Sequence, residues 1–494
     1  MNASQTRFLG IDLGTGSLKV ALVDEWGVER AVASVAYTLD TPQPGWAEID
    51  VERWWRALVE ACARLPGSER AAVRGIGFSG QMHGVVLTDA AGRALRPAML
   101  WPDTRARGLL DAWAEDTEGA ASNPVAPGMA GPLLRWLLQH EPAIADAARW
   151  ALQPKDWLRV RLAGAAREAF VADPSDACAT ALAAPDGAWD LALIERLGLP
   201  ARWFAPLAPS GAASGTLDAD AAQALGVPAG VVLATGAGDT PCAALGSGLR
   251  EDGDALLTTG TGGQILVTAR TAPPAPSVWQ GLHRYRSASG GWYAMAAMQN
   301  VGVALEAARG WLAYDWAQAY EDAFAAPSSP TLAFLPYLSG ERSPWLDPAA
   351  RGGWLGAGIG DTRGVLMRAA FEGVAFALRA GLEALREAKA GGTSDAAIAT
   401  LKLAGGGSVD PRWRQLLADV LGAQLDAIDC PNAATRGAAL LGGVASGHWR
   451  MDELAALAPA STRVAQPRED AALAQRYARF IDLYGRVRTW FPAA

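Results

Sequence analysis

The stretch Phe8-Leu9-Gly10-Ile11-Asp12-Leu13-Gly14-Thr15-Gly16-Ser17 decides the fold class of this chain. Its first four residues form an apolar run, and the residues from Asp12 onward form a polar turn that contains two glycines. Residues 18–24 are again largely apolar. Two strands joined by a short glycine-containing loop are typical of a β-hairpin. The sequence therefore predicts a hairpin whose turn begins with a carboxylate.

A related pattern occurs in the second half of the chain, around Gly260-Thr261-Gly262. Residues 255–258 lead into this turn and residues 265–267 lead out of it, and both stretches are mainly apolar. Two glycine turns of one kind indicate a weak internal repeat and therefore two lobes of similar design. The copies differ in one informative way, because Thr258 stands where the first copy has Asp12, so only the first copy carries the carboxylate.

The length of the chain, 494 residues, requires more than one domain, because a single hydrophobic core stops growing at roughly 250–300 residues. Half of the residues are hydrophobic and 19% are charged, which is the composition of a globular protein. We place the boundary just before the second hairpin, which gives an N-terminal domain of residues 1–243 and a C-terminal domain of residues 244–494.

Charge and composition argue against several classes of partner. The net charge is −8 and the basic residues are scattered, whereas nucleic acid and anionic membranes require a concentrated positive face. No apolar run approaches the ~18 residues that a membrane-spanning helix needs. The four cysteines lie in no CxxC pair and at no zinc-ligand spacing, which favours a reducing compartment. With a short polar start that lacks the apolar core of a signal peptide, these features predict a cytoplasmic protein.

An α/β element follows in the C-terminal half. Residues 401–404 are predicted as a strand and residues 424–428 as another, with a helix between them. Asp410 is a good helix N-cap and Pro411 suits the first helical position. Strand, glycine turn, helix and strand in this order are typical of an α/β fold.

The first candidate site is the turn that contains Asp12, Gly14, Thr15 and Gly16, with Lys19 nearby. Glycines let the backbone approach phosphate oxygens closely, and the exposed N–H groups can donate to them. The Asp12 carboxylate can hold a magnesium ion, usually through waters. Taken alone, the turn is better explained as an ordinary hairpin loop. The second Gly-Thr-Gly turn favours a polyphosphate site shared by the two turns.

The second candidate is Gly238-Asp239-Thr240, which follows the apolar strand predicted over residues 230–234. An aspartate at the end of a strand in an α/β fold opens into the region where ligands usually bind. Such a carboxylate can accept the proton of a hydroxyl that attacks a phosphoryl group. The local sequence is equally consistent with a helix N-cap.

The third candidate is Gln81-Met82-His83, which lies between two apolar strands and is flanked by glycines. An amide and an imidazole presented together can hydrogen-bond several sugar hydroxyls. Local sequence slightly favours a buried structural histidine instead. The fourth is Gly405-Gly406-Gly407, whose lack of side chains can provide a flat surface for an adenine ring. The alternative is a tight strand-to-helix turn, which needs fewer than three glycines.

Jointly, these motifs resemble those of the FGGY family of carbohydrate kinases, over residues 8 to about 447. The stretches that carry the resemblance are Asp12-Leu13-Gly14-Thr15, Gly80-Gln81-Met82-His83, Gly236-Ala237-Gly238-Asp239, Leu335-Pro336-Tyr337-Leu338-Ser339-Gly340-Glu341-Arg342-Ser343-Pro344 and Gly405-Gly406-Gly407. Within the family, three stretches resemble the xylulokinases: Gly80 to His83, Pro42-Gln43-Pro44-Gly45-Trp46-Ala47-Glu48 and Pro154-Lys155-Asp156-Trp157-Leu158.

The resemblance implies two actin-like (ribonuclease H-like) ATPase domains with a catalytic cleft between them. The N-terminal domain would bind sugar and magnesium, and the C-terminal domain would bind ATP. Asp239 would be the catalytic base, with Asp12 and Asp239 at the metal. The sugar would contact Gln81, Met82, His83, Asp239 and Thr240, and ATP would contact Gly14, Thr15, Gly16, Lys19, Gly260, Thr261, Gly262, Gly405 and Gly406.

The expected function is ATP- and Mg²⁺-dependent phosphorylation of D-xylulose to D-xylulose 5-phosphate. Thr240 departs from the family pattern, since xylulokinases usually have Asn after the catalytic aspartate. A kinase for another ketose or polyol, such as ribulose, a pentitol or glycerol, therefore stays an alternative. Outside the sugar kinases, the alternatives are a nucleotide-gated protein of the actin or chaperone type and a phosphohydrolase. The expected partners are the sugar and ATP, with neither nucleic acid nor membrane, and the sequence leaves a homodimer open.

Overall fold

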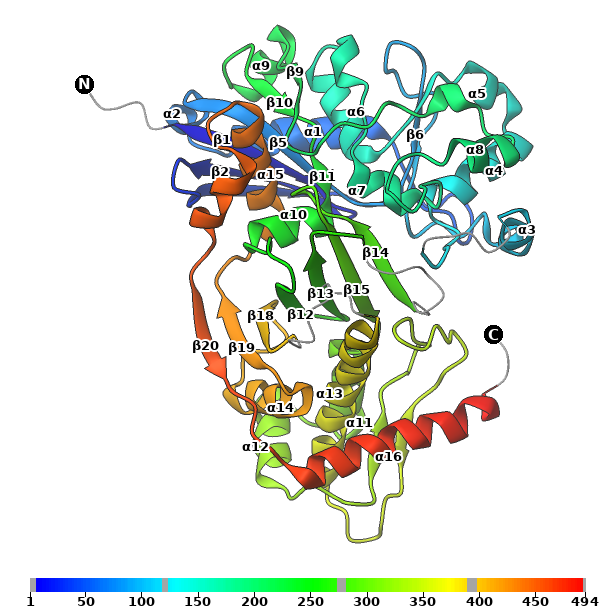
Figure 1. The fold of residues 1–494 in the computed structure, drawn as a ribbon, viewed down its shortest axis with the longest axis vertical. Helices are drawn as coiled ribbons and strands as arrows, with labels where there is room; N and C mark the ends of the chain where they lie inside the picture. The colour runs from blue at the N-terminus through cyan, green and yellow to red at the C-terminus, as the bar shows by residue number, and fades with distance from the viewer. Residues whose placement is uncertain (1–5, 118–122, 273–280, 389–397, 492–494) are drawn as a thin grey trace. The chain divides into compact units, whose positions relative to one another are not determined.

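The computed structural model describes residues 6–117, 123–272, 281–388 and 398–491 (Figure 1). The chain forms two units, each built from several segments. Unit 1 consists of Met1–Arg250, Tyr285–Trp292 and Asn432–Pro459, and unit 2 consists of Glu251–Arg284, Tyr293–Pro431 and Ala460–Ala494. The domain boundary after residue 243 and the cleft between domains stay predictions. Within the described residues, no helix combines the length and the apolar character needed to cross a membrane.

A mixed sheet forms the centre of unit 1, with the strand order β3-β2-β1-β5-β10-β9 and with β11 paired to β5. The first three strands are antiparallel, whereas β1, β5 and β10 run parallel. The predicted first hairpin is confirmed as β1 and β2. The strands are β1 (Arg7–Leu13), β2 (Ser17–Asp24), β3 (Glu29–Ala36), β5 (Val73–Gly80), β9 (Ala213–Thr216), β10 (Val232–Ala234) and β11 (Ala237–Gly238).

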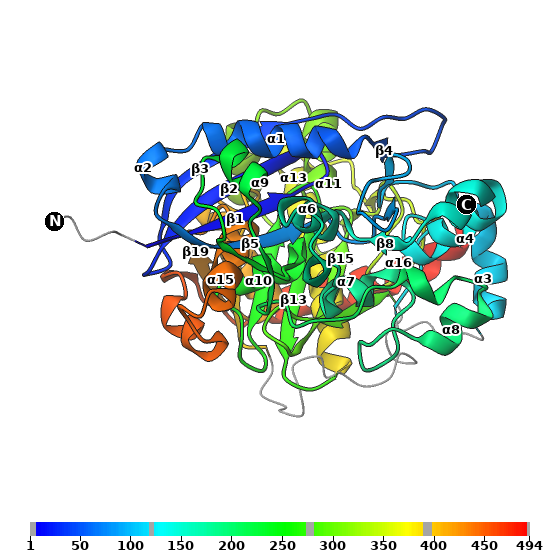
Figure 2. The same ribbon diagram turned by 90° about the horizontal axis from the view of Figure 1, so that it is seen from above.

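Helices cover both faces of this sheet (Figure 2). Strand alternation sends Leu9, Ile11 and Leu13 into a core shared with α1, α6 and α9. The opposite face packs against α10 and α15, which comes from far along the chain yet lies beside β1 and β5. The helices are α1 (Val51–Ala63), α6 (Pro154–Leu162), α9 (Ala219–Leu225), α10 (Asp239–Gly246) and α15 (Ala433–Ala445).

The approach of α15 to the sheet is close enough to require glycines in the strands. A Cβ atom at Gly10 would collide with the Thr435 carbonyl oxygen, and one at Gly77 would collide with the carbonyl oxygen of Ala438. Helix backbone therefore lies directly on strand backbone at the strands that end in the candidate site.

A smaller cluster of unit 1 packs around Trp113 and Trp203, both of which are fully buried. The elements of this cluster and the remaining short elements of unit 1 are β4 (Glu48–Ile49), β6 (Val86–Thr88), β7 (Ala98–Met99), β8 (Trp150–Leu152), α2 (Gly67–Arg70), α3 (Leu110–Asp116), α4 (Ala130–His140), α5 (Pro142–Ala147), α7 (Pro174–Ala177) and α8 (Leu191–Arg196).

The main sheet of unit 2 has the strand order β14-β15-β13-β12-β18-β19-β20. The antiparallel pair β12 and β13 confirms the predicted second hairpin, and β18 and β19 continue the sheet in parallel. The strands are β12 (Ala255–Thr259), β13 (Gly263–Ala269), β14 (Leu282–Arg286), β15 (Trp292–Met298), β18 (Thr400–Ala404), β19 (Gln424–Ile428) and β20 (Ser461–Ala465), with β16 (Ala333–Leu335) and β17 (Gly353–Leu355) in a separate pair.

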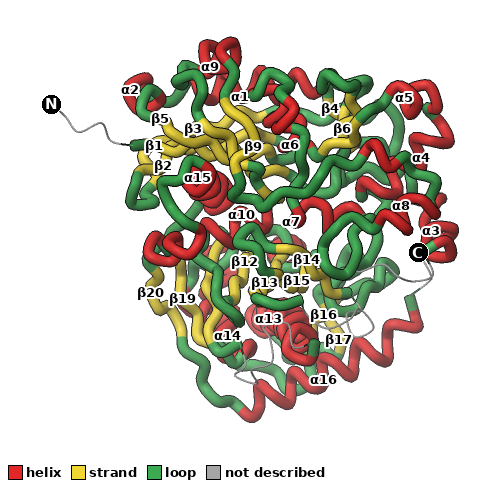
Figure 3. Tube along the Cα trace, turned by 45° about the horizontal axis from the view of Figure 1, so that its top comes forward, coloured by secondary structure: helices red, strands yellow, loops and turns green. Residues whose placement is uncertain are grey.

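Helices α11 to α14 and α16 complete unit 2, beside the strands drawn yellow in Figure 3. The predicted α14 is confirmed: the Asp410 side chain accepts hydrogen bonds from the backbone N–H groups of Arg412 and Trp413, and Gly422 ends the helix with φ 60°. The helices are α11 (Gly302–Trp311), α12 (Trp316–Ala325), α13 (Arg363–Glu387), α14 (Pro411–Leu421) and α16 (Ala471–Val487).

Candidate active site

The two candidate carboxylates of unit 1 come to one edge of its sheet. Asp12, near the end of β1, is in register with Ser79 of β5, and Ser79 is in register with Ala237 of β11. Asp239 begins α10 directly after β11. Since neighbouring strands lie about 4.8 Å apart, the backbones that carry the two aspartates are about 10 Å apart across β5. Residues 227 positions apart in the sequence therefore meet at one site.

The surroundings of these carboxylates disfavour their charged forms. Asp239 is half-buried, and its burial raises the pKa to about 6, with a further contribution from the negative charge of Asp12. Its Oδ1 accepts hydrogen bonds from the Thr240 backbone N–H (2.6 Å) and from the Thr240 hydroxyl (3.2 Å). Burial also raises the pKa of Asp12, against the opposing effects of a Ser79 hydrogen bond (2.7 Å) and of Lys19. A nearby cation would therefore stabilise the charged form of each carboxylate.

The first glycine turn is held from one side and open on the other. The Tyr37 hydroxyl donates to the Gly14 carbonyl at 2.6 Å, and the Trp101 indole N–H donates to Thr15 Oγ1 at 2.8 Å. At Gly16, an added Cβ would find no heavy atom of the described structure within 4 Å. A ligand can therefore approach the turn at Gly16, as a phosphate site requires.

Lys19 lies on β2 directly across from Asp12. Its ammonium group donates to Asn432 Oδ1 at 2.8 Å. Its predicted contact with ATP stays a prediction, and its observed position places a positive charge beside the Asp12 carboxylate.

Gln81 supports the same turn. Its side-chain NH₂ donates to the Gly14 carbonyl at 3.2 Å, and its Oε1 accepts from the Thr15 hydroxyl at 3.3 Å. The side chain is buried. The structure thus shows Gln81 as a brace for the glycine turn, and its predicted contact with sugar stays a prediction.

Met82 and His83 lie next to Gly238 and Ala179, respectively. A Cβ atom at Gly238 would be 2.6 Å from Met82 Cγ, so Met82 packs against the residue that precedes Asp239. His83 has a left-handed backbone with φ 75°, and its Nδ1 lies 2.6 Å from the Ala179 carbonyl oxygen. Because a carbonyl only accepts, Nδ1 carries the proton and Nε2 of the neutral ring is an acceptor.

The predicted ATP-binding glycines of unit 2 also come together. Thr258 of β12 is in register with Ala404 of β18, so the two glycine turns follow neighbouring parallel strands. The Gly407 N–H donates to the Thr259 carbonyl at 3.2 Å and joins the turns. Backbone hydrogen bonds from the start of α11 hold the turn at Gly260. The Gly302 N–H donates to the Gly260 carbonyl and the Val303 N–H to the Thr261 carbonyl, both at 3.0 Å.

A cavity of about 430 Å³ opens beside the turn at Gly260, Gly262 and Gly263. Gln264, Gln299 and Arg342 also line it, and no role for these three residues is predicted from the sequence. Arg342 lies in the Leu335–Pro344 stretch, and the resemblance of that stretch to the family was the sequence signal that could have identified it. The buried Glu341 carboxylate positions two of them, because it accepts from the backbone N–H groups of Gln299 (2.6 Å) and Arg342 (2.8 Å).

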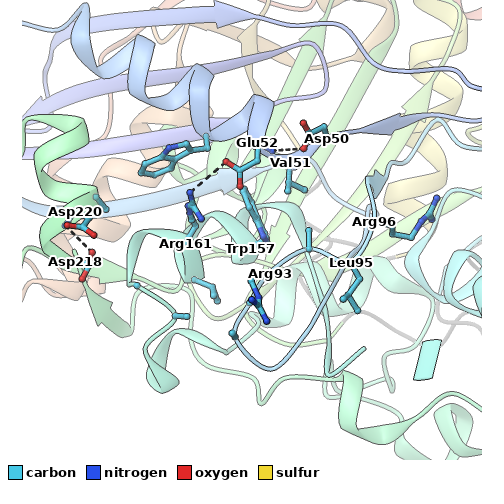
Figure 4. A pocket seen from close by; sticks show the side chains of 18 of the residues that line it. Asp50, Val51, Glu52, Arg93, Leu95, Arg96, Trp157, Arg161, Asp218 and Asp220 are labelled. Atoms are coloured by element: carbon cyan, nitrogen blue, oxygen red, sulfur yellow. Dashed lines mark hydrogen bonds and ion pairs between the residues drawn. The ribbon is translucent and has the colours of Figure 1, made fainter. Parts of the chain in front are cut away.

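A second cavity, of about 620 Å³, lies in unit 1 (Figure 4). Asp50, Glu52, Arg161 and Asp218 are among its lining residues, whereas Asp12, His83 and Asp239 are not. Three of its lining carboxylates already have partners. Asp50 and Asp218 cap the N-termini of α1 and α9, and Glu52 pairs with Arg161 at 3.7 Å. This cavity is separate from the candidate active site.

The carboxylates of unit 1 fit a magnesium ion that is bound mainly through its substrate. Among the described residues, no three His, Cys, Asp or Glu side chains gather into a cage that could hold a metal alone. Magnesium is usually held by one or two carboxylates together with phosphate oxygens and waters. Asp12 and Asp239 supply two carboxylates whose pKa values are raised chiefly by burial, and a bound cation would favour their charged forms.

Comparison with known proteins gives matches over most of the chain. Residues 7–246 match the model of the N-terminal domain of the FGGY family of carbohydrate kinases, and residues 255–446 match that of the C-terminal domain. A xylulose kinase of Escherichia coli K12 is 33% identical over 438 residues, which cover 85% of this chain and 86% of that protein.

Solved structures agree in fold. The crystal structure of a xylulose kinase from Brucella ovis is 32% identical, with a TM-score of 0.89 over 98% of this chain and 100% of that one. A gluconate kinase from Lactobacillus acidophilus has a TM-score of 0.88 at 22% identity, over 99% of each chain. At that identity the likeness shows the fold alone. The matches confirm two α/β domains of the actin-like, ribonuclease H-like ATPase fold.

Proposed function

The chain belongs to the FGGY family of carbohydrate kinases and is an ATP-dependent sugar kinase, and we propose that its substrate is D-xylulose. The product would be D-xylulose 5-phosphate. The observation that carries the proposal is the meeting of Asp12 and Asp239 at one sheet edge of unit 1, beside Met82. The identity to xylulose kinases over most of the chain supports the choice of sugar. Membership in this family sets aside the actin- or chaperone-like protein and the phosphohydrolase.

Asp239 is assigned as the general base. Its carboxylate takes the proton of the C5 hydroxyl as that oxygen attacks the γ-phosphorus of ATP, and ADP leaves. A pKa of about 6 suits this task, because the group is mostly ionised at neutral pH yet more basic than an ordinary aspartate. Thr240 holds Oδ1 with two hydrogen bonds, so we assign Oδ2 to the sugar hydroxyl.

ATP is assigned to the glycine turns. The turn Gly260-Thr261-Gly262 would hold phosphates, with the backbone N–H groups of Thr261 and Gly262 as donors and Arg342 of the same cavity as a further positive charge. The Gly260 N–H donates to the Gly262 carbonyl at 2.8 Å and so fixes the shape of the turn. Gly405 and Gly406 would receive the adenosine, and Gly14, Thr15, Gly16 and Lys19 would complete the phosphate contacts. Asp12 and Asp239 would hold Mg²⁺, which when bound neutralises charge on the phosphates.

Thr240 supports a second candidate, a kinase for another ketose or polyol. Its hydroxyl is already bonded to Asp239 at 3.2 Å, and it is shorter than the asparagine that xylulokinases usually have there. His83 Nε2 is assigned as an acceptor for a sugar hydroxyl. We place the reaction in the cytoplasm, which Cys62 and Cys242, both buried free thiols, support.

A panel of sugars tests the proposal in an assay that couples ADP release to a chromogenic reaction. D-Xylulose should give the highest kcat/KM among D-xylulose, D- and L-ribulose, pentitols, glycerol and gluconate. The Asp239→Asn variant is the control for ADP release that does not depend on the base. A higher kcat/KM for another substrate would replace D-xylulose, and full activity of the variant would refute the assignment of Asp239.

A further inference from the structure

Fully buried charges form a cluster behind the candidate active site. Lys155 Nζ lies 2.7 Å from Asp156 Oδ1, 2.9 Å from Asp173 Oδ1 and 2.9 Å from Asp176 Oδ2. Arg159 adds a second cation, 2.7 Å from Asp156. Burial raises the pKa of Asp176, against the opposing effect of Lys155. Protonation of one of the three carboxylates would leave two cations to balance two negative charges, as a buried cluster requires.

The buried cluster packs against the ends of β5 and β11, the strands that lead into the candidate active site. Strand alternation places Gly80 and its partner Gly238 on the face of the sheet opposite Ser79. A Cβ atom at Gly80 would lie 2.9 Å from Lys155 Cβ, and one at Gly238 would lie 3.3 Å from Asp176 Oδ1. The charged cluster therefore lies directly against the last residue of β11, immediately before Asp239.

A hydrogen-bonded chain connects the cluster to that residue. Asp173, whose Oδ1 pairs with Lys155, accepts at Oδ2 from the Ser175 hydroxyl (2.6 Å) and from the Ser175 backbone N–H (2.9 Å). The Ser175 Oγ in turn accepts from the Gly238 N–H at 3.1 Å. Strand β11 has only two residues, and this bond adds a side-chain anchor at its end, beside its pairing with β5.

We propose that Ser175 is a positioning residue for the base: anchored through Asp173 on Lys155, it fixes the Gly238 peptide and thereby the direction of the Asp239 carboxylate. This inference rests on the proposed role of Asp239. Burying so many charges contributes little net stability and is more readily explained by the geometry that it imposes. A displacement of about 1 Å at a reacting group lowers rates up to roughly a hundredfold.

The test compares Ser175→Ala with Ser210→Ala. Ser210 Oγ also donates to Asp173 Oδ2, at 3.1 Å, and is also buried, but its side chain has no bond to Gly238 in the described structure. For Ser175→Ala we expect kcat to fall roughly tenfold or more, with the KM for ATP unchanged. Ser210→Ala should keep nearly full kcat, while both variants lose a similar amount of thermal stability. Equal kcat losses in the two variants would overturn the proposal.

A second pair of variants covers the case in which Ser175→Ala does not fold. Threonine and valine have the same shape and differ only in the hydroxyl. Ser175→Thr should exceed Ser175→Val in kcat by roughly tenfold, and equal rates would refute a role for the hydroxyl. The result is separable from the assignment of the base. If Asp239→Asn keeps full turnover, the proposed function fails, whereas a normal Ser175→Ala with an inactive Asp239→Asn removes only the positioning role.

Discussion

Replacing Asp239 by asparagine should stop phosphoryl transfer and at the same time stabilise the folded protein. The pKa of this group is raised from 3.8 to about 6, chiefly by burial. Its charged form is therefore less favourable in the folded state than in the unfolded state. One pKa unit corresponds to 1.36 kcal/mol, so the ionised carboxylate costs about 3 kcal/mol of folding free energy above pH 7. Asparagine has a similar shape and can still accept the Thr240 hydrogen bonds without this cost.

The dependence on pH follows from the sign of the shift. A raised carboxyl pKa leaves stability intact below the unfolded-state value and removes it as pH rises through the folded-state value. The advantage of the variant should therefore be about 3 kcal/mol at pH 8, about half of that at pH 5, and absent below about pH 3.5. Solvent access to the half-buried side chain makes these figures upper bounds.

The measurement is the urea midpoint of each protein at pH 8 and pH 5, together with sugar-dependent ADP release. Asp146→Asn, which changes an exposed carboxylate on α5, is the matched control and should leave both quantities unchanged. If Asp239→Asn shows the same stability difference at both pH values, burial of the charged carboxylate does not destabilise the folded protein. If it retains turnover, the carboxylate is not the base.

Three further predictions concern the base, the fold of unit 1 and the ATP site. In the wild type, kcat/KM should decline about tenfold per pH unit below about pH 6, as Asp239 becomes protonated, and a flat profile down to pH 5 would contradict this. Gly77→Ala should destabilise the protein by about 1–3 kcal/mol because its Cβ meets the backbone of α15. Gly485→Ala, at an open position in α16, should instead stabilise it by up to about 1 kcal/mol. Chemical denaturation of both variants measures the sign of each change in stability. Arg342→Ala should raise the KM for ATP roughly tenfold or more with little change in the KM for sugar, and an equal rise in both would show that the arginine supports the loop only.

Local patterns were sufficient to predict the elements that carry most of the site. The hairpins at Asp12 and at Gly260 could be predicted because strand, glycine turn and strand are adjacent in the sequence, and α14 because Asp410 and Pro411 mark its start. Such signals depend on neighbours within a few residues, so the structure reproduces them.

The remaining features depend on contacts that no local pattern encodes. Helix α15 is a small-residue, largely apolar segment in the sequence. Glycines at 10, 75 and 77 of the strands and at 442 of the helix allow it to lie on β1 and β5, hundreds of residues away. Likewise, Lys155, Asp173 and Asp176 read as scattered polar residues, although their side chains meet in a fully buried cluster. The role of a single side chain is also hard to predict from sequence, as Gln81 illustrates. Its amide forms two hydrogen bonds to the glycine turn, and the same amide could equally have bound a sugar.

The two sheets use one arrangement for two kinds of chemistry. In each, a hairpin strand with a glycine turn pairs in parallel with a neighbour, β1 with β5 and β12 with β18. The matching positions are Asp12 beside Ser79 in unit 1 and Thr258 beside Ala404 in unit 2. A triphosphate repels carboxylates unless a cation intervenes, so an anionic ligand is best received where the strand ends offer backbone N–H groups and no acid. A base for a neutral hydroxyl, by contrast, needs a carboxylate. The absence of a carboxylate from the second copy therefore supports the proposal that the turns of unit 2 hold ATP, with the turn at Gly14 completing the phosphate contacts, and that the sugar and the magnesium carboxylates belong to unit 1.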